Sequence, residues 1–313
     1  MKMLMLRFHA QVLLLFLALV LFATAPHLGL AAADLSVPSR FPSQGTIPTP
    51  DTLQGCGGAR FVSSNGDFET EVLVQVNRIR QEHHLPPLKR HPDLDASARF
   101  HAADMAMENY FSHSSYDLVN GELVESCAWS ERIRTYYGDW WSVAENIAAG
   151  FATPADVVQA WMDSPGHRAN ILSETNWEIG IGYFEGPGLY RRYWVQDFAR
   201  PNDRYPLVLD GDAPVTETGD LSVYIYGDWK DVRFRTDDGP WSPWRPFQRP
   251  LTYRLEGVAG LHTVHAEMRT EEGFVKTASD EIVLSQSNIQ PALSDLPERL
   301  TFTFFTETGQ IQP

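Results

Sequence analysis

One run near the middle of the chain reads Trp161-Met162-Asp163-Ser164-Pro165-Gly166-His167-Arg168-Ala169-Asn170-Ile171-Leu172. Apolar residues at the helical period lead into it. Pro165 predicts the end of that helix, because proline lacks a backbone N–H and pushes the residue before it out of the α region. Gly166 then permits a backbone angle that other residues avoid. We therefore expect His167 on a tight turn directly after a helix, a placement that suits a ligand or a base.

Three helices are predicted before and around this run. The first spans about 68–84 and the second about 92–109, and in both the apolar residues recur at the helical period. The third begins at Thr153-Pro154-Ala155-Asp156, where Thr153 can cap the helix and Asp156 completes a capping box. Residues 111–142 contain Gly121 and Gly138 and show no sustained period, so we predict a long loop there.

The second half of the chain has the pattern of strands. Two alternating runs, 177–184 and 190–198, are separated by Gly186-Pro187-Gly188 and predict a hairpin. Helices followed by paired strands predict an α+β fold with an antiparallel sheet. Beyond a Pro- and Gly-rich stretch, short strands are predicted at the spacing of an all-β sandwich, over 221–226, 232–236, 252–255, 263–269 and 274–284. Residues 300–306 would form a last strand or a frayed tail.

The N-terminal segment has the pattern of a secretory signal. Lys2 and Arg7 precede the apolar run 12–23, and Ala31-Ala32-Ala33 offers a cleavage site of small residues. We expect a secreted, extracellular protein that is not an integral membrane protein once the signal is removed; a retained N-terminal anchor is the alternative. The formal net charge of −15 argues against nucleic acid and anionic membranes as partners, because Lys and Arg bind both.

Cys56 and Cys127 are the only cysteines of the chain. In an exported protein two cysteines more often pair than stay free, and such a bridge would close a long loop, worth about 4 kcal/mol in the chain-entropy model. A reactive cysteine nucleophile is the alternative, but the flanking signature of such enzymes is absent. Together these patterns predict a signal peptide at 1–33, a flexible linker at 34–60, a first domain at 61–200, a linker at 201–219, a smaller β-sandwich at 220–287 and a tail or last strand at 288–313.

Three residues next to predicted structural breaks are candidates for a functional site: His113, Glu145 and His167. Two imidazoles and one carboxylate are what a zinc site with an open position requires, although copper or nickel also suits such a set. The same trio without a metal can act as an acid–base relay, since a carboxylate fixes the tautomer of a histidine and raises its basicity. The spacing alone leaves open whether the three side chains meet.

Several motifs of the first domain occur in a characteristic order. They are Asn77 in the first helix, Leu94-Asp95-Ala96-Ser97-Ala98-Arg99-Phe100-His101-Ala102-Ala103-Asp104-Met105-Ala106, Phe111-Ser112-His113, Ala144-Glu145-Asn146-Ile147-Ala148, the run from Trp161 to Leu172, Ile179-Gly180-Ile181-Gly182-Tyr183 and Tyr193-Trp194-Val195-Gln196-Asp197-Phe198. This order resembles the bacterial CAP domain, also called the SCP domain, of the cysteine-rich secretory protein, antigen 5 and pathogenesis-related 1 superfamily. The resemblance covers about 67–200.

The resemblance implies an α-β-α sandwich with a central cleft that carries two His and two Glu in the better-studied members. His113 matches the first His, Glu145 the first acid and His167 the second His. The second acid should lie on the helix before His167, where this chain offers only Asp163 and Ser164. This departure puts the full set of four, and with it tight metal binding, in doubt.

Weaker candidates lie elsewhere in the chain. His101 and Asp104 are one helical turn apart and would either face the cleft or form a solvated polar face. Neither a His-Glu-x-x-His motif nor a Gly-x-Ser-x-Gly elbow occurs. The C-terminal part, with 238–244 and 260–269, resembles an immunoglobulin-like or fibronectin-III-like module. Trp229, Trp241 and Trp244 would be either a sugar-stacking platform or part of the sandwich core or edge.

Three functional hypotheses follow. The leading one is an extracellular binding module whose cleft, lined by His113, Glu145, His167 and Asp163, binds a divalent cation such as zinc or a small ligand. Lipid is one ligand linked to CAP domains elsewhere, and a cell-envelope component is a further partner. The second hypothesis is a metal-assisted hydrolase of peptides or cell-envelope material, in which His113 and His167 hold the metal and Glu145 is a ligand or base. The third is an adhesin that binds glycans through the sandwich.

Overall fold

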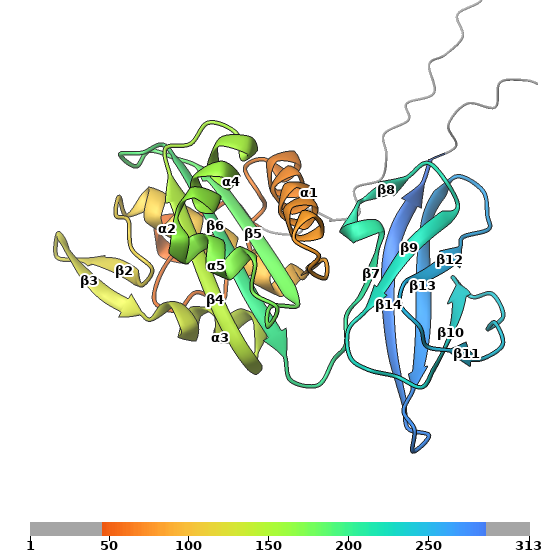
Figure 1. The fold of residues 1–313 in the computed structure, drawn as a ribbon. Coiled ribbons are helices and arrows are strands. Elements are labelled where there is room, and N and C mark those ends of the chain that lie inside the picture. Colours follow the sequence, from red (N-terminus) through yellow and green to blue (C-terminus); the bar gives the residue numbers. More distant parts are fainter. Residues whose placement is uncertain (1–45, 286–313) are drawn as a thin grey trace, which may run out of the picture. The chain divides into compact units, whose positions relative to one another are not determined.

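A computed structural model of the 313-residue chain describes residues 46–285 (Figure 1). The signal peptide expected at 1–33, the first part of the linker expected at 34–60 and the tail or strand expected at 288–313 lie outside the described residues. No helix within 46–285 is long and apolar enough to span a membrane.

The first domain is built on a four-stranded sheet. The order of its strands is β1-β5-β6-β4, with bounds β1 Lys89–Arg90, β4 Trp140–Ala149, β5 Glu178–Glu185 and β6 Arg192–Pro201. β5 and β6 form the expected antiparallel hairpin, β4 pairs antiparallel with β6, and β1 pairs parallel with β5. β4 is therefore an edge strand of this sheet.

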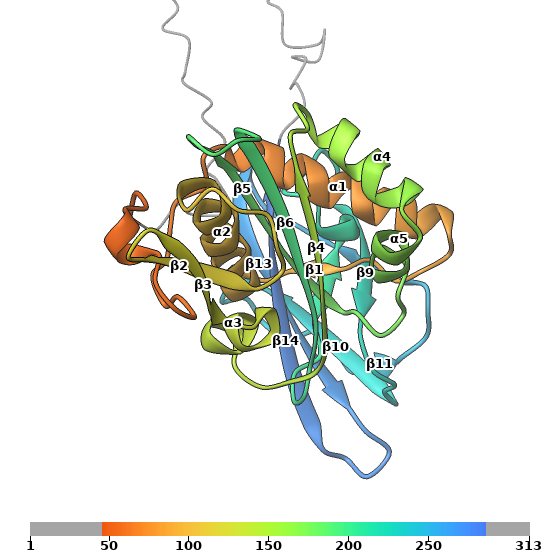
Figure 2. The same cartoon turned by 90° about the vertical axis from the view of Figure 1, so that its left-hand side faces the viewer.

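Helices cover both faces of the sheet, which makes an α-β-α sandwich and confirms the predicted α+β fold. The five are α1 Gly66–Glu82, α2 Pro92–Met107, α3 Trp129–Tyr137, α4 Pro154–Asp163 and α5 Pro165–Ile171. Side chains of a strand alternate between faces. Trp194 and Phe198 of β6 accordingly pack with α1, α4 and α5, whereas Tyr193, Val195 and Ala199 pack with α2 and α3. Figure 2 shows these two groups of helices on the two sides of the strands.

Glycines on β5 allow α2 to lie directly on the sheet. A Cβ at Gly180 would come within 2.0 Å of the Leu94 carbonyl carbon, and one at Gly182 within 2.2 Å of the Ala98 carbonyl carbon. No side chain fits such gaps, so this pair of glycines, two residues apart on one face, sets the distance between helix and sheet.

The long loop predicted at 111–142 is wrong. The segment forms a hairpin, β2 Ser115–Val119 and β3 Glu122–Cys127, followed by α3. Asn120 and Gly121 both have positive φ, 54° and 88°, as a two-residue hairpin turn requires. In α3, Ile133, Tyr136 and Tyr137 are buried at helical spacing. Each element is short, and no single period runs through the whole segment.

The tight turn predicted at His167 is also wrong. α4 ends at Asp163 as expected, with Thr153 capping its first turn, but Pro165 opens α5 rather than a loop. Proline is well suited to the first position of a helix, because the N–H that it lacks would have no intrahelical partner there. Gly166 is an ordinary helical residue without positive φ, so His167 lies in the first turn of α5.

The N-terminal residues that the structure describes are packed against the first domain. Cys56 and Cys127 form the disulfide that the sequence favoured. Leu53 and Phe61 are buried in a cluster with Phe100, and a short 3-10 helix, η1, spans Pro50–Thr52. Residues 46–60 are therefore not the flexible linker that was expected there, because a disulfide and an apolar cluster hold them.

The second domain is all-β and begins earlier than predicted. One sheet has the order β11-β10-β13-β14-β8 and the other β12-β9-β7. The bounds are β7 Leu207–Leu209, β8 Val215–Thr216, β9 Asp220–Ile225, β10 Asp231–Thr236, β11 Arg245–Pro246, β12 Leu251–Arg254, β13 Gly260–Arg269 and β14 Val275–Leu284, with the 3-10 helix η2 at Asp210–Asp212. Residues 207–216 belong to these sheets and are not a linker. The immunoglobulin-like or fibronectin-III-like assignment stays a prediction.

Polar and aromatic contacts join α1 and β1 to the second domain. Asn77 Nδ2 donates to Leu88 O (2.9 Å) and to Gly211 O (2.8 Å). Lys89 Nζ contacts the carboxylates of Asp212 and Asp280, both at 2.6 Å. The described residues accordingly lie within one compact unit, in which the two domains touch.

Candidate functional site

The carboxylate of Glu145 has partners on both of its oxygens. Glu145 lies on β4, on the face covered by α2 and α3, and its side chain is 1% exposed. Oε1 contacts His113 Nδ1 at 2.7 Å, and Oε2 accepts a hydrogen bond from Arg132 Nη2. Burial works to raise the Glu145 pKa, but Arg132 and the neighbouring histidines outweigh it and lower that pKa to about 2. Glu145 is therefore an ionised carboxylate neutralised by an arginine.

Arg132 was not predicted from the sequence. It lies on α3, is fully buried, and also donates from Nη1 to His113 O and to Ser115 Oγ, both at 3.0 Å. One guanidinium thus fixes the Glu145 carboxylate and the backbone of His113 together. The helix that carries Arg132 could have been predicted from the apolar residues Trp129, Ile133 and Tyr137, which recur every four residues.

His113 presents one ring nitrogen to the surface. Its Nδ1 is used by Glu145, whereas Nε2 has no hydrogen-bond partner among residues 46–285, and the side chain is 50% exposed. Because the carboxylate orients the ring, Nε2 has a fixed direction before any ligand arrives.

His167 approaches the site from the other face of the sheet. Asn146 Nδ2 donates to His167 O (3.2 Å), and Asn170 Nδ2 donates to Asn146 Oδ1 (2.9 Å) and to Glu145 O (3.2 Å). Glu145 and Asn146 are consecutive in β4 and point to opposite faces. The two histidines therefore flank the edge strand β4, one from each side. Burial and the charge of His113 both lower the pKa of His167, which keeps its imidazole neutral near pH 7.

Asp163 lies at the exposed C-terminal end of α4. Its Oδ1 accepts from Gln159 Nε2 at 2.9 Å, within the same helix, and no contact joins it to Glu145 or to either histidine. The structure thus brings His113 and Glu145 together, places His167 across β4, and leaves Asp163 outside this group.

The donor set does not fit a three-ligand metal site. Zinc takes carboxylate oxygen and imidazole nitrogen, but both oxygens of Glu145 are engaged, one by a guanidinium that repels a cation. No group of three or more His, Cys, Asp or Glu within the described part of the chain could hold a metal ion. What remains for a ligand is a pair of imidazoles beside a neutralised carboxylate.

His101 and Asp104 do not form the solvated polar face that was one expectation, because both side chains of α2 are fully buried. His101 Nε2 contacts Ser112 O at 2.8 Å, and burial lowers the His101 pKa to about 3, so the ring is neutral. Asp104 accepts a hydrogen bond from Tyr110 Oη, and burial raises the Asp104 pKa to about 7. They are interior supports of the site.

Asp197 is a second buried carboxyl group that the sequence did not single out. It lies directly opposite Glu145 in the β4–β6 register and is fully buried, and neither oxygen has a hydrogen-bond partner among residues 46–285. Burial raises the pKa of Asp197 well above its usual range, and the charge of Glu145 adds to this. Two adjacent buried carboxyl groups cannot both ionise cheaply, so Asp197 keeps its proton.

The tryptophans of the second domain contact neighbouring side chains. Guanidinium groups lie over Trp241 (Arg233 at 5.1 Å and Arg235 at 5.0 Å) and over Trp244 (Arg233 at 4.7 Å and Arg269 at 4.5 Å). Trp229 packs edge-on against Tyr205. Cation–π stacking on Trp241 and Trp244 therefore covers part of the surface that a sugar would need.

Residues 73–198 match the model of the cysteine-rich secretory protein family, CAP. The chain is 33% identical over 168 residues to uncharacterized protein YkwD of Bacillus subtilis, a match that covers 54% of this chain and 58% of that protein. It is 26% identical over 123 residues to Golgi-associated plant pathogenesis-related protein 1 of Homo sapiens, covering 38% of this chain and 75% of that protein. The match thus spans little more than half of the Bacillus relative.

Two solved structures match part of this chain. One is an extracellular protein containing an SCP domain from Bacillus anthracis, with 29% identity, a TM-score of 0.37, and coverage of 43% of this chain and 40% of that one. An outer surface protein from Borrelia burgdorferi matches with 18% identity and a TM-score of 0.38, over 44% of this chain and 95% of that one.

Proposed function

Residues 73–198 of this chain are a CAP domain of the cysteine-rich secretory protein family, and from this premise we propose that the protein is an extracellular module that binds a small polar ligand at His113 and His167. The observation that carries the proposal is the pairing of Glu145 with both Arg132 and His113. That pairing leaves the carboxylate unavailable as a ligand and turns it into the group that orients an exposed imidazole.

The charge balance of the site suggests the chemistry of the ligand. Arg132 neutralises Glu145, His167 is neutral, and the amides of Asn146 and Asn170 surround the backbone there. A neutral site rich in hydrogen-bonding groups favours hydroxyl and amide groups over a strong charge. Sugars and short peptides of the cell envelope carry such groups, and they are the ligand class that we propose.

A metal-assisted hydrolase remains the second candidate. It would need Glu145 as a ligand or as a base, and either role requires breaking a buried ion pair, which is strongly unfavourable. The adhesin hypothesis is less favoured, because guanidinium groups already stack on Trp241 and Trp244. Extracellular location is part of the proposal; it is supported by the disulfide, which persists in oxidising compartments, and by the signal-like N-terminal sequence.

Side-chain NMR of the full chain labelled with ¹⁵N-histidine tests the ligand proposal, with N-acetylmuramyl dipeptide as the probe. Resonances of His113 and His167 should shift on titration while those of the exposed His83 stay unchanged. His113→Ala should remove the binding, whereas His83→Ala, on the surface at the end of α1, should not. Shifts that persist in His113→Ala, or no shift of His113 at millimolar probe, would overturn the proposal.

A further inference from the structure

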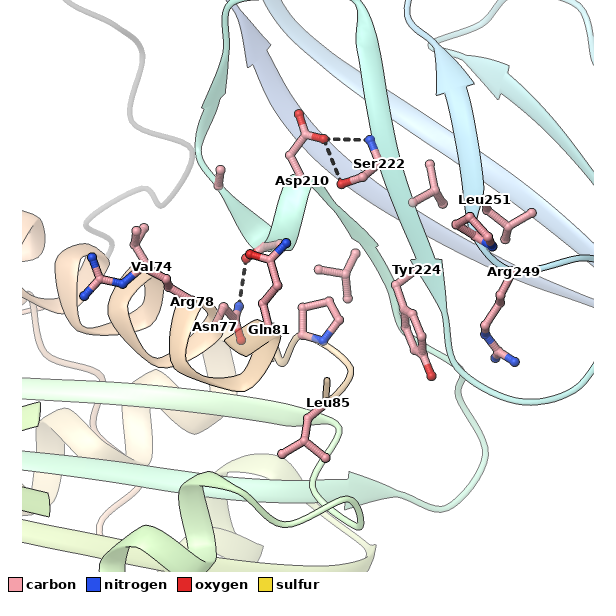
Figure 3. Close-up of a pocket in the computed structure, with 16 residues that line it drawn as sticks. Val74, Asn77, Arg78, Gln81, Leu85, Asp210, Ser222, Tyr224, Arg249 and Leu251 are labelled. Atoms are coloured by element: carbon pink, nitrogen blue, oxygen red, sulfur yellow. Dashed lines mark hydrogen bonds between the residues drawn. The ribbon is translucent and has the colours of Figure 1, made fainter. Parts of the chain in front are cut away.

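A cavity of about 710 Å³ lies between α1 and the second domain (Figure 3). Val74, Gln81 and Leu85 line it from the first domain, and Val223, Tyr224 and Leu251 from the second. Both walls belong to the same compact unit. Its volume is within the range of small-molecule sites, roughly 300–1,000 Å³, and sites of this kind favour domain interfaces.

Hydrogen bonds join the two domains at one end of the cavity. Asn77, which lines one end of the cavity, is hydrogen-bonded to Leu88 and to Gly211. Asp210 at the same end is held by the backbone N–H (2.7 Å) and hydroxyl (3.1 Å) of Ser222. Val74 on the α1 side of the cavity is 44% exposed, whereas Val223 and Leu251 on the other side are nearly buried. The polar groups at this end have partners, so the apolar surface open to a ligand is that of Val74 and the half-buried Leu85.

The guanidinium of Arg249 lies at the opposite end of the cavity. Arg249 Nη2 donates to Ile225 O (2.8 Å) and to Gly227 O (2.7 Å), and its guanidinium lies over the rings of Tyr224 (5.0 Å) and Phe247 (4.9 Å). Its one ion pair, with Asp228 at 3.5 Å, joins it to a fully exposed carboxylate and is weak. A guanidinium fixed in this way keeps donors for an oxyanion and loses little entropy on binding one.

We propose that this cavity is a binding site for a small molecule with an apolar body and a single oxyanion group, such as a carboxylate or sulfonate. The body lies against Val74, Leu85, Val223 and Leu251, and the anionic group meets Arg249. The side-chain amide of Gln81 and the hydroxyl of Tyr224, which have no hydrogen-bond partner among the described residues, are available to polar groups in between. This site is separate from the histidines of the cleft.

Fluorescence titration of the full chain with two probes tests the proposal. The probes are 8-anilinonaphthalene-1-sulfonate, which carries the anion, and N-phenyl-1-naphthylamine, which is neutral but has the same apolar body. Val74→Trp, a change at an exposed position, fills the cavity and should weaken the binding of both probes at least tenfold. The matched control Glu71→Trp, exposed on the same helix but outside the lining, should leave both affinities unchanged.

Variants of Arg249 test the anionic group of the ligand separately from its apolar body. Arg249→Gln should weaken the sulfonate probe by about tenfold, the size of a lost charged hydrogen bond, and leave the neutral probe within about twofold. Arg249→Lys keeps the charge and should restore part of the sulfonate affinity. Arg254→Gln, an exposed arginine of β12, is the control. Equal binding by wild type and Val74→Trp, or equal loss of both probes in Arg249→Gln, would refute the site.

Discussion

Arg132 and Glu145 form a buried ion pair in which each charge depends on the other. Both side chains are at most 1% exposed, and the guanidinium also holds the backbone of His113. Such a pair adds little net stability, but removing one partner leaves an uncompensated charge in the interior. The residue types of the cleft, and a carboxylate that orients a histidine, could be predicted from sequence. The ion pair of Glu145 with Arg132 could not, because Arg132 lies on a helix that was not predicted.

Replacing Arg132 with Met should destabilise the fold by about 3–5 kcal/mol, since Glu145 would lose its counter-charge inside the protein. Urea denaturation followed by circular dichroism measures the free energy of unfolding. Arg134→Met is the matched control on the same helix. Arg134 makes exposed ion pairs and lies over the ring of Trp140, so this variant should stay within about 1 kcal/mol of wild type. Equal stabilities for the two variants would contradict the role given to Arg132.

Asp197 predicts a pH dependence of stability. Its pKa is raised from 3.8 in the folded state, so above about pH 4 the folded protein binds more protons than the unfolded chain, and stability falls as pH rises toward the folded pKa. Asp197→Asn removes this titration. The free energy of unfolding of the variant should rise relative to that of wild type as pH increases above 4. At pH 7 the variant should be more stable by about 1–3 kcal/mol.

The matched control for Asp197 is Asp163→Asn, at an exposed helix end. It should change the free energy of unfolding at pH 7 by no more than about 0.5 kcal/mol. A flat difference for Asp197→Asn between pH 4 and pH 8 would show that this carboxyl is not held protonated by burial and by Glu145.

At the scale of elements, the contact between α2 and β5 depends on two glycines. Their motif, Ile179-Gly180-Ile181-Gly182-Tyr183, belongs to the resemblance noted from sequence, and the structure supplies its physical reason. The isoleucines face α1 and α4, and the glycines let the backbone of α2 approach the strand. A period of two was enough to predict the strand, but not the helix that lies on it.

Gly182→Ala should destabilise the protein by at least about 2 kcal/mol, because the new Cβ would lie 2.2 Å from the Ala98 carbonyl carbon and 2.3 Å from its oxygen, so α2 would have to move. Gly166→Ala in α5 is the control. It has open space and an ordinary φ, and it should stabilise by about 0.5–1 kcal/mol. Thermal unfolding that ranks Gly182→Ala at or above wild type would disprove this account of the packing.

Helices with long apolar stripes, α1 and α2, were predicted within two residues of their ends, and the β5–β6 hairpin was found as well. The predictions of secondary structure were wrong where elements are short or follow one another directly. In residues 115–137 a hairpin and a helix follow each other without a common period. At Pro165 the same proline that ends α4 opens α5, and sequence rules allow either outcome.

At the scale of the whole molecule, contacts between residues distant in sequence join the domains. Lys89 reaches Asp212 and Asp280, more than 120 residues further along the chain, and Trp177 stacks on Tyr226 at 4.8 Å. Nothing local in the sequence marks these partners, so the stretch 201–219 was predicted as a linker from its prolines and glycines. The number of domains and their classes were predictable; the contacts between them were not.

The central claim is that Glu145 orients His113 and does not bind a metal. Calorimetric titration of zinc chloride into the full, oxidised chain tests it most directly, with His113→Ala and His167→Ala alongside. The account predicts no zinc binding of micromolar affinity at the cleft, and titration curves for both variants that match wild type. Zinc binding at micromolar affinity or tighter that disappears in both variants would contradict it, and would make the metal-assisted hydrolase the leading hypothesis.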